Sequence, residues 1–236
     1  MSTPVSARPR PIIAIDGPAG AGKSSLARSL AEKLGFLLVD TGAMYRAIAL
    51  AAQRAGVPWT EGERLGALGQ SLVRDRSVSF VPDAGRGVRV FLHGEDISEA
   101  IRTPDIAMGA STVSAHGPVR DALLDLQRQA GEGGGVVLEG RDIGTVVFPD
   151  AEIKIFLTAT PEVRAARRHA ELLQKGQEVS FEATLADVRA RDAQDMGRAV
   201  APLRQAEGAV LVDSSTMDFD ATLARMVRIA TEGHRS

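Results

Sequence analysis

The stretch Gly17–Ser24 reads GPAGAGKS and follows directly on the short apolar run Ile12–Asp16. It matches the pattern GxxxxGK[ST], in which glycines let consecutive backbone N–H groups curl around phosphate oxygens. Lys23 is then expected to reach the β- and γ-phosphates, and the Ser24 hydroxyl to bind Mg²⁺. The segment Lys23–Leu34 carries leucine at every fourth position from Leu26, which predicts a helix whose N-terminus faces the same anion. The pattern and its context therefore predict a phosphate-binding loop that holds a nucleoside triphosphate.

The loop residues assigned to the phosphates are Gly17, Pro18, Ala19, Gly20, Ala21, Gly22, Lys23, Ser24 and Ser25.

Composition excludes several other classes of protein. At 236 residues and 44% hydrophobic, the chain can bury the core of one domain with insertions. A net charge of −2 and a pI of about 6.1 leave no basic field for nucleic acid or an anionic membrane. There is no cysteine, and the four histidines lack ligand spacing. No apolar run is long enough to span a bilayer, so we expect a cytoplasmic protein.

Short apolar runs alternate with helical patterns along the chain, which predicts an α/β fold with a parallel five-stranded sheet flanked by helices. The expected strands are 12–16, 36–40, 136–139, 152–157 and 210–213. The expected helices are 23–34, 42–55, 118–130, 161–175, 181–193 and 219–231. Between them, 77–81 and 88–92 read as a β-hairpin, which does not belong in such a sheet. Residues 77–115 are therefore interpreted as a small inserted subdomain.

Ligands of open parallel sheets bind beyond the carboxyl ends of the strands. Three polar segments follow the first three expected sheet strands: the phosphate-binding loop, Asp40–Gly42 and Gly140–Asp142. We expect these segments to converge on one crevice.

Other classes of protein that contain a phosphate-binding loop match this sequence less well. An Asn-Lys-x-Asp guanine motif and a Leu-Ser-Gly-Gly-Gln transporter signature are both missing from the sequence. Gly133–Gly135 superficially matches the triple glycine of shikimate kinases, but Gly42 stands where those enzymes carry the second aspartate of Asp-x-Asp. A kinase of a small molecule remains the leading hypothesis.

Three blocks together resemble the signatures of bacterial cytidylate kinases, which are nucleoside monophosphate kinases. They are 40–46 (DTGAMYR), 140–149 (GRDIGTVVFP) and the segment from Arg191 to Leu203 (RDAQDMGRAVAPL). We expect a disordered tail at 1–11, and the resemblance implies a kinase core at 12–76 and 116–232. It also implies a helical lid at about 160–195 and a nucleoside-monophosphate-binding insert at 77–115. Thr41 stands where serine is also common in the family and keeps the hydroxyl.

The resemblance implies transfer of the γ-phosphate of ATP to CMP or dCMP, with Mg²⁺. The acceptor is a phosphate with a second pKa near 6, so it needs no general base. Catalysis then depends on alignment and on cancelling the repulsion between two anions. By resemblance, Arg46, Arg141 and Arg198 grip the CMP phosphate. Lys23, Arg141 and Arg198 are the expected catalytic residues.

The remaining acceptor residues also follow from the resemblance. Cytosine offers an amino donor at N4 and acceptors at N3 and O2, which suits a carboxylate or hydroxyl facing N4 and an arginine facing N3 and O2. The family's cytosine-reading positions fall on Asp142, Ser111 and Arg120, and its sugar contacts on Arg191 and Asp195. Thr41 and Tyr45 complete the expected CMP site, although Tyr45 can equally be a packing residue.

Arg164, Arg167 and Arg168 have i, i+3, i+4 spacing, which predicts a single cationic stripe on a lid that closes over the ATP phosphates. Two alternatives stay open: a kinase of UMP or of a hydroxylated metabolite such as shikimate, and a loop that binds ATP as a switch without transferring phosphate. A hydroxylated acceptor would require Asp40 or Asp142 as a base. The family leads us to expect a monomer.

Overall fold

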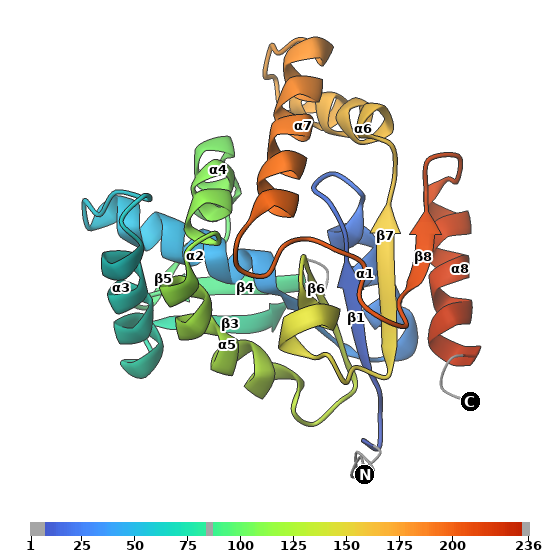
Figure 1. Cartoon of the computed structure of the whole chain (residues 1–236), viewed down its shortest axis with the longest axis horizontal. Coiled ribbons are helices and arrows are strands. Elements are labelled where there is room, and N and C mark those ends of the chain that lie inside the picture. Colours follow the sequence, from blue (N-terminus) through green and yellow to red (C-terminus); the bar gives the residue numbers. More distant parts are fainter. Residues whose placement is uncertain (1–7, 84–86, 233–236) are drawn as a thin grey trace.

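The centre of the fold is a five-stranded sheet in which every neighbouring pair of strands is parallel (Figure 1). The structure, a computed structural model, describes residues 8–83 and 87–232. The strand order is β2-β6-β1-β7-β8, with β1 (Ile12–Asp16), β2 (Leu37–Asp40), β6 (Val136–Gly140), β7 (Ile153–Thr158) and β8 (Val210–Asp213). The predicted parallel sheet is confirmed, and each strand end lies within one residue of its predicted position.

The two faces of β1 belong to different hydrophobic clusters, because successive side chains of a strand point to opposite faces. Ile13 and Ile15 pack in the same cluster as residues of α1 (Lys23–Leu34) and α8 (Phe219–Glu232). Ile12 and Ala14 instead pack with η2 (Ile143–Val147), a short π-helix. Both faces are covered, which accounts for the near-continuous apolar character of the strands.

A second, antiparallel sheet lies beside the first. It consists of β3 (Val78–Asp83), β4 (Gly87–Leu92) and the short β5 (Glu95–Asp96), in that order. Its buried side chains share one cluster with α2 (Thr41–Arg54), α4 (Pro104–Val113) and α5 (Gly117–Gly131). The predicted hairpin is confirmed as β3 and β4, and residues 84–86 of its expected loop lie outside the described residues.

Two α-helices of the described residues were not predicted. Helix α3 (Gly62–Arg74) contains glycines, which weaken a helical signal by about 1 kcal/mol each. A Cβ on Gly66 would lie 2.4 Å from Cβ of Pro118, so the glycine permits close packing of α3 on α5. The start of α4 carried a readable signal, since the Thr103 hydroxyl accepts from the N–H of Ile106 at 3.4 Å and a proline follows it.

Helices α6 (Pro161–Gln174) and α7 (Phe181–Gly197) rise above the carboxyl edge of the sheet (Figure 1). Their first turns are capped by Thr160 and Ser180, whose hydroxyls accept from backbone N–H groups three residues later. These helices occupy the region predicted to be a lid. Its mobility stays a prediction, as do the bounds of the core and the insert.

The tail predicted to be disordered over residues 1–11 is described only from residue 8. Arg8 donates to Asp150 at 2.5 Å and to Glu152 at 2.9 Å. The guanidinium of Arg10 lies 4.4 Å from the ring centroid of Phe36. The described end of the tail therefore lies against the core, and residues 1–7 lie outside the described residues.

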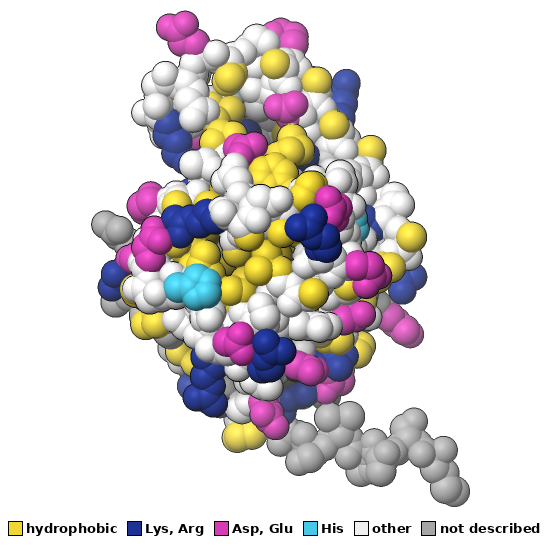
Figure 2. Space-filling view, turned by 90° about the vertical axis from the view of Figure 1, so that its left-hand side faces the viewer, with side chains coloured by type: hydrophobic (Ala, Val, Ile, Leu, Met, Phe, Trp, Pro, Cys, Tyr) yellow, Lys and Arg dark blue, Asp and Glu magenta, His cyan; other side chains and the backbone are white. Residues whose placement is uncertain are grey.

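The face turned to the viewer in Figure 2 carries Lys and Arg intermingled with Asp and Glu, around hydrophobic side chains near its centre. Charges of one sign do not dominate this face. Within residues 8–83 and 87–232, no helix combines the length and the apolar character needed to cross a membrane.

Candidate active site

The phosphate-binding loop lies between β1 and α1 and depends on glycine for its path. Gly17 has φ of 153°, and a Cβ there would lie 1.9 Å from the carbonyl oxygen of Leu157 on β7. Gly22, with φ of 87°, caps the N-terminus of α1 in a left-handed conformation. Only glycine adopts these conformations at low cost. The loop is therefore held closely against the carboxyl end of the sheet.

Lys23 is buried at the start of α1. Its Nζ donates to the carbonyl oxygen of Pro18 at 2.7 Å. Burial, followed by repulsion from Arg141, lowers the pKa of Lys23 well below its ordinary value. A phosphate beside the ammonium would favour its charged form again. A bound anion would therefore favour the charged form of this buried lysine.

Glu139, on β6, lies opposite the start of α1. The Ser24 hydroxyl donates to Glu139 Oε2 at 2.9 Å. The other carboxylate oxygen, Oε1, is buried and has no hydrogen-bond partner among the described residues. Burial, and then the neighbouring Asp40, raise the pKa of Glu139 to about 7. The hydroxyl and the carboxylate together form a pair of hard oxygen donors of the kind that Mg²⁺ prefers.

The buried charge of Glu139 leads to a prediction for stability. Because the pKa of Glu139 is raised on folding, its contribution to stability is present below the unfolded value of 4.5 and is lost as the pH rises through about 7. We expect Glu139→Gln to raise the free energy of unfolding of the ligand-free protein by up to about 3 kcal/mol at pH 8, and by little at pH 5. Denaturant unfolding of both proteins at both pH values measures the difference. A variant less stable than the wild type at pH 8 would contradict this electrostatic account.

Four predicted arginines and one aspartate gather on the acceptor side. Asp195, on α7, accepts from Arg141 Nε at 2.8 Å and lies 3.7 Å from Arg198 Nη2. Arg191 lies on the same helix, and burial, followed by repulsion from Arg141 and other cations including Arg46, lowers its pKa. Burial likewise lowers the pKa of Arg198. The cluster carries more positive than negative charge, and its side chains are largely shielded from water.

Several nitrogen donors of this cluster are buried without a hydrogen-bond partner in the described part of the chain. They are Nε of Arg46, Nε of Arg191 and Nη2 of Arg198. Arg46 also donates from Nη2 to Asp40 at 2.8 Å. Buried donors are normally satisfied, so unpaired guanidinium nitrogens at one edge of a sheet indicate a place for an anion.

A second group of predicted residues forms a buried ion pair beside this cluster. Arg120 Nη2 donates to Asp142 Oδ2, and Arg120 Nη1 donates to the carbonyl oxygen of Ser114 at 3.3 Å. The guanidinium of Arg120 lies 5.6 Å from the ring centroid of Tyr45, which is buried. Burial raises the pKa of Asp142, while Arg120 acts in the opposite direction. Tyr45 therefore supports Arg120 as a packing partner.

Two predicted hydroxyl groups bind other parts of the protein. Ser111 Oγ donates to Gln194 Oε1 on α7 at 3.0 Å. Thr41 Oγ1 donates to the backbone oxygen of Glu139 at 2.7 Å and so joins the ends of β2 and β6. Contact of either hydroxyl with a nucleotide stays a prediction.

The single cationic stripe predicted for α6 is not present. Arg164 is buried and donates to both oxygens of Asp192 on α7, at 2.9 and 2.6 Å, and to the carbonyl oxygen of Ala19 in the phosphate-binding loop at 3.0 Å. Arg167 donates to Ser214, and Arg168 to Glu171. Of the three arginines only Arg164 is buried, and each of them has a different partner. Arg164 therefore connects helices α6 and α7 to the phosphate-binding loop.

Comparison with known proteins identifies the family. The family model described as cytidylate kinase matches residues 13–232. The chain belongs to the cytidylate kinase family. Relatives named cytidylate kinase include that of Syntrophotalea carbinolica, which is 55% identical over 94% of this chain and 92% of its own length. The relative from Geobacter sp. is 52% identical over 94% of this chain and 93% of its own, and that from Pseudomonas aeruginosa is 48% identical over 92% and 94%.

Sequence reasoning missed several polar residues at the site of this cytidylate kinase family member. Asp16 and Glu139 are the carboxylates at the ends of β1 and β6, and each could have been found as an acid that ends an apolar run. Asp192, Gln194 and Ser114 bind predicted site residues, and only the folded chain brings them together. These residues hold the predicted side chains in place.

Proposed function

We propose that this chain transfers the γ-phosphate of ATP to CMP or dCMP, giving ADP and CDP or dCDP. The observation that carries the proposal is the cluster of Arg141, Arg191 and Arg198 around Asp195, with unpaired buried donors. Membership of the cytidylate kinase family supports it along nearly the whole chain. An anionic acceptor would relieve the repulsion among these cations, and a neutral acceptor would not.

The proposed reaction needs alignment and charge neutralisation. The acceptor phosphate supplies its own nucleophilic oxygen, so no residue has to remove a proton. Lys23 would bind the donor phosphates, while Arg198 and Arg46 would hold the acceptor phosphate with forked hydrogen bonds. Arg141 lies between the two halves, since it is paired with Asp195 and also lowers the pKa of Lys23. It is therefore the residue best placed to stabilise charge as it passes from donor to acceptor.

The donor side fits a magnesium ion. Ser24 and Glu139 would hold it, and the unpartnered Oε1 of Glu139 is the observation that favours this assignment. Held there, Mg²⁺ would neutralise negative charge on the transferred phosphate. The chain itself contributes the position of the hydroxyl and the burial of the carboxylate.

Cytosine would be read by the buried pair of Asp142 and Arg120. A carboxylate accepts from the N4 amino group of cytosine, whereas it would repel the O4 oxygen of uracil. Burial makes an unpaired polar group costly, so this mismatch would discriminate against UMP. Arg191 and Asp195 would contact the sugar.

The alternative acceptors fit the residues less well. A hydroxylated acceptor would need a free carboxylate as base, but Asp40 is paired with Arg46 and Asp142 with Arg120. A switch that transfers no phosphate would have no use for the arginine cluster. Location in the cytoplasm and a monomeric state are further proposals, as is the absence of a nucleic-acid partner.

An acceptor panel tests the proposed function. ADP release is measured with ATP and Mg²⁺ and with CMP, dCMP, UMP, AMP, GMP or shikimate in turn. CMP and dCMP are expected to give the highest kcat/KM. A clearly better acceptor among the others would overturn the substrate assignment, and hydrolysis of ATP at the same rate without any acceptor would favour the switch.

A further inference from the structure

Asp16 is a buried carboxylate that the proposed mechanism does not use. It is the last residue of β1 and directly precedes the phosphate-binding loop. Its Oδ1 accepts from the backbone N–H of Ile143 at 2.8 Å, and its Oδ2 accepts from the N–H of Gly144 at 2.7 Å. Both oxygens of the carboxylate are therefore bound to two consecutive residues at the start of η2.

These two N–H groups follow immediately on Arg141 and Asp142, the residues that are expected to hold the acceptor. A shift at Ile143 moves the backbone of Asp142 with it, because the residues are joined by a planar peptide unit. The first residues of an α- or π-helix also have no N–H partners within the helix itself. Asp16 supplies these partners from a different strand, so it sets where η2 begins.

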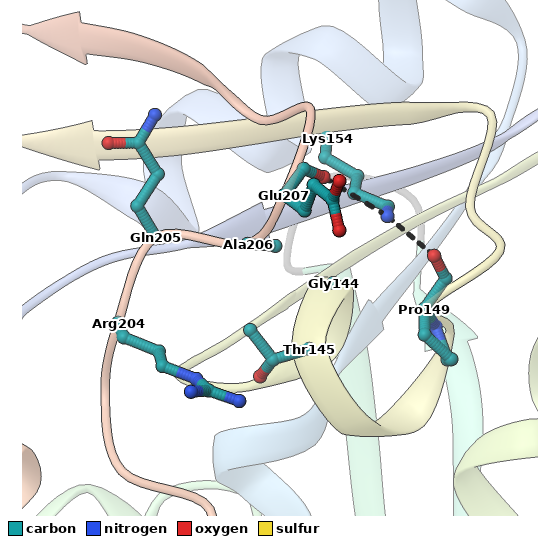
Figure 3. Close-up of a pocket in the computed structure, with 8 residues that line it drawn as sticks. All are labelled: Gly144, Thr145, Pro149, Lys154, Arg204, Gln205, Ala206 and Glu207. Atoms are coloured by element: carbon teal, nitrogen blue, oxygen red, sulfur yellow. Dashed lines mark hydrogen bonds between the residues drawn. The ribbon is translucent and has the colours of Figure 1, made fainter.

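The far side of η2 packs against Ala206 at Gly144 and also borders a cavity. Gly144 and Thr145 border a surface cavity of about 670 Å³ that is closed on its other side by the segment 204–207 (Figure 3). A Cβ on Gly144 would lie 3.1 Å from Cβ of Ala206 and 3.4 Å from Asp16 Oδ2, so only a small residue fits against the carboxylate. The hydrophobic contact of Ile143 holds one side of the turn. The two hydrogen bonds that Asp16 accepts from Ile143 and Gly144 hold the backbone itself.

We propose that Asp16 is a positioning residue, which fixes Arg141 and Asp142 relative to the phosphate-binding loop and thereby sets both the affinity for the acceptor and the choice of cytosine. This inference rests on the proposed function for the identity of the acceptor. It assigns the role to a residue whose two carboxylate oxygens both accept from backbone N–H groups. Because Asp16 is joined to Gly17, one carboxylate links the donor loop to the acceptor loop.

Substitution of Asp16 by asparagine tests the charge and the hydrogen bonds of this side chain without changing its shape. Asp16→Asn keeps the volume of the side chain, but its amide nitrogen would face one of the two N–H donors. Displacement by even about 1 Å can cost up to about a hundredfold in a positioned site. At pH 8 we expect KM for CMP to rise at least about tenfold and the CMP to UMP ratio of kcat/KM to fall at least about tenfold. KM for ATP should stay within about threefold of the wild type.

A matched control removes hydrogen bonds from the other end of the same helix. Arg128 donates to the carbonyl oxygens of Val146 and Val147 at 3.2 Å each. Arg128→Gln should therefore lower the melting temperature without changing the CMP to UMP ratio. Both variants are first checked by thermal unfolding.

The outcomes distinguish this inference from the proposed function. If wild-type protein prefers CMP and Asp16→Asn lowers the activities with CMP and UMP by the same factor, Asp16 has a structural role only and the inference is wrong. The inference is also wrong if Arg128→Gln changes the CMP to UMP ratio of kcat/KM as much as Asp16→Asn does. If the wild type does not prefer CMP, the proposed function itself fails, independently of either variant.

Discussion

Replacing Lys23 with alanine is expected to lower kcat for phosphoryl transfer by about a thousandfold. Lys23 is the buried ammonium in the phosphate-binding loop, and no other lysine or arginine occurs within that loop. Removal of a single positioned donor of transition-state charge typically costs about 10²- to 10³-fold, and more where a full positive charge is lost. The effect should be on kcat more than on KM for CMP, because the acceptor cluster does not include Lys23.

The fold should survive this substitution. Burial lowers the pKa of Lys23, so the ligand-free protein gains little from the charge. Lys33→Ala is the matched control, because Lys33 lies on the same helix but in its last turn and is exposed. Steady-state kinetics and thermal unfolding of both variants decide the outcome. Near-normal turnover by folded Lys23→Ala protein would show that the phosphate-binding loop does not take part in phosphoryl transfer.

Much of the donor half could be predicted from the sequence, because the relevant signal is local. The GPAGAGKS segment has the same local physics in any chain: an apolar strand, glycines with positive φ, and a helix start. The apolar runs gave the sheet, since strands buried on both faces are apolar at nearly every position. The resemblance to cytidylate kinases then identified the family that the comparisons confirm.

What could not be predicted depends on residues that meet only in the folded chain. Helix α3 contains glycines that favour other conformations in isolation, and its close packing against Pro118 on α5 explains Gly66. Arg164 has the spacing of an exposed stripe, yet it is buried against Asp192 and the phosphate-binding loop. Neither partner lies within one helical turn of Arg164. Spacing therefore gives the face of a helix on which a charge lies, but not whether the fold buries that face.

Replacing Asp142 is expected to change the choice of base more than any other substitution. Asp142→Ala should lower kcat/KM for CMP by about a hundredfold and that for UMP by less than about tenfold, because only cytosine loses a hydrogen bond to the carboxylate. The same change leaves the buried guanidinium of Arg120 without its ion pair. That loss can cost about 3 to 5 kcal/mol of stability, so the unfolding temperature has to be measured beside the kinetics.

Asp142→Asn keeps the prediction testable if the alanine variant unfolds. The amide retains an oxygen that accepts from N4 of cytosine and adds a nitrogen that can donate to O4 of uracil. It should therefore lower the ratio of kcat/KM for CMP to kcat/KM for UMP, because kcat/KM for UMP rises. The loss of kcat/KM for CMP should be smaller than in Asp142→Ala. Asp121→Ala, which removes an exposed carboxylate next to Arg120 on α5, is the control and should leave the ratio unchanged. Equal losses for CMP and UMP in folded Asp142 variants would show that this carboxylate supports Arg120 and does not read the base.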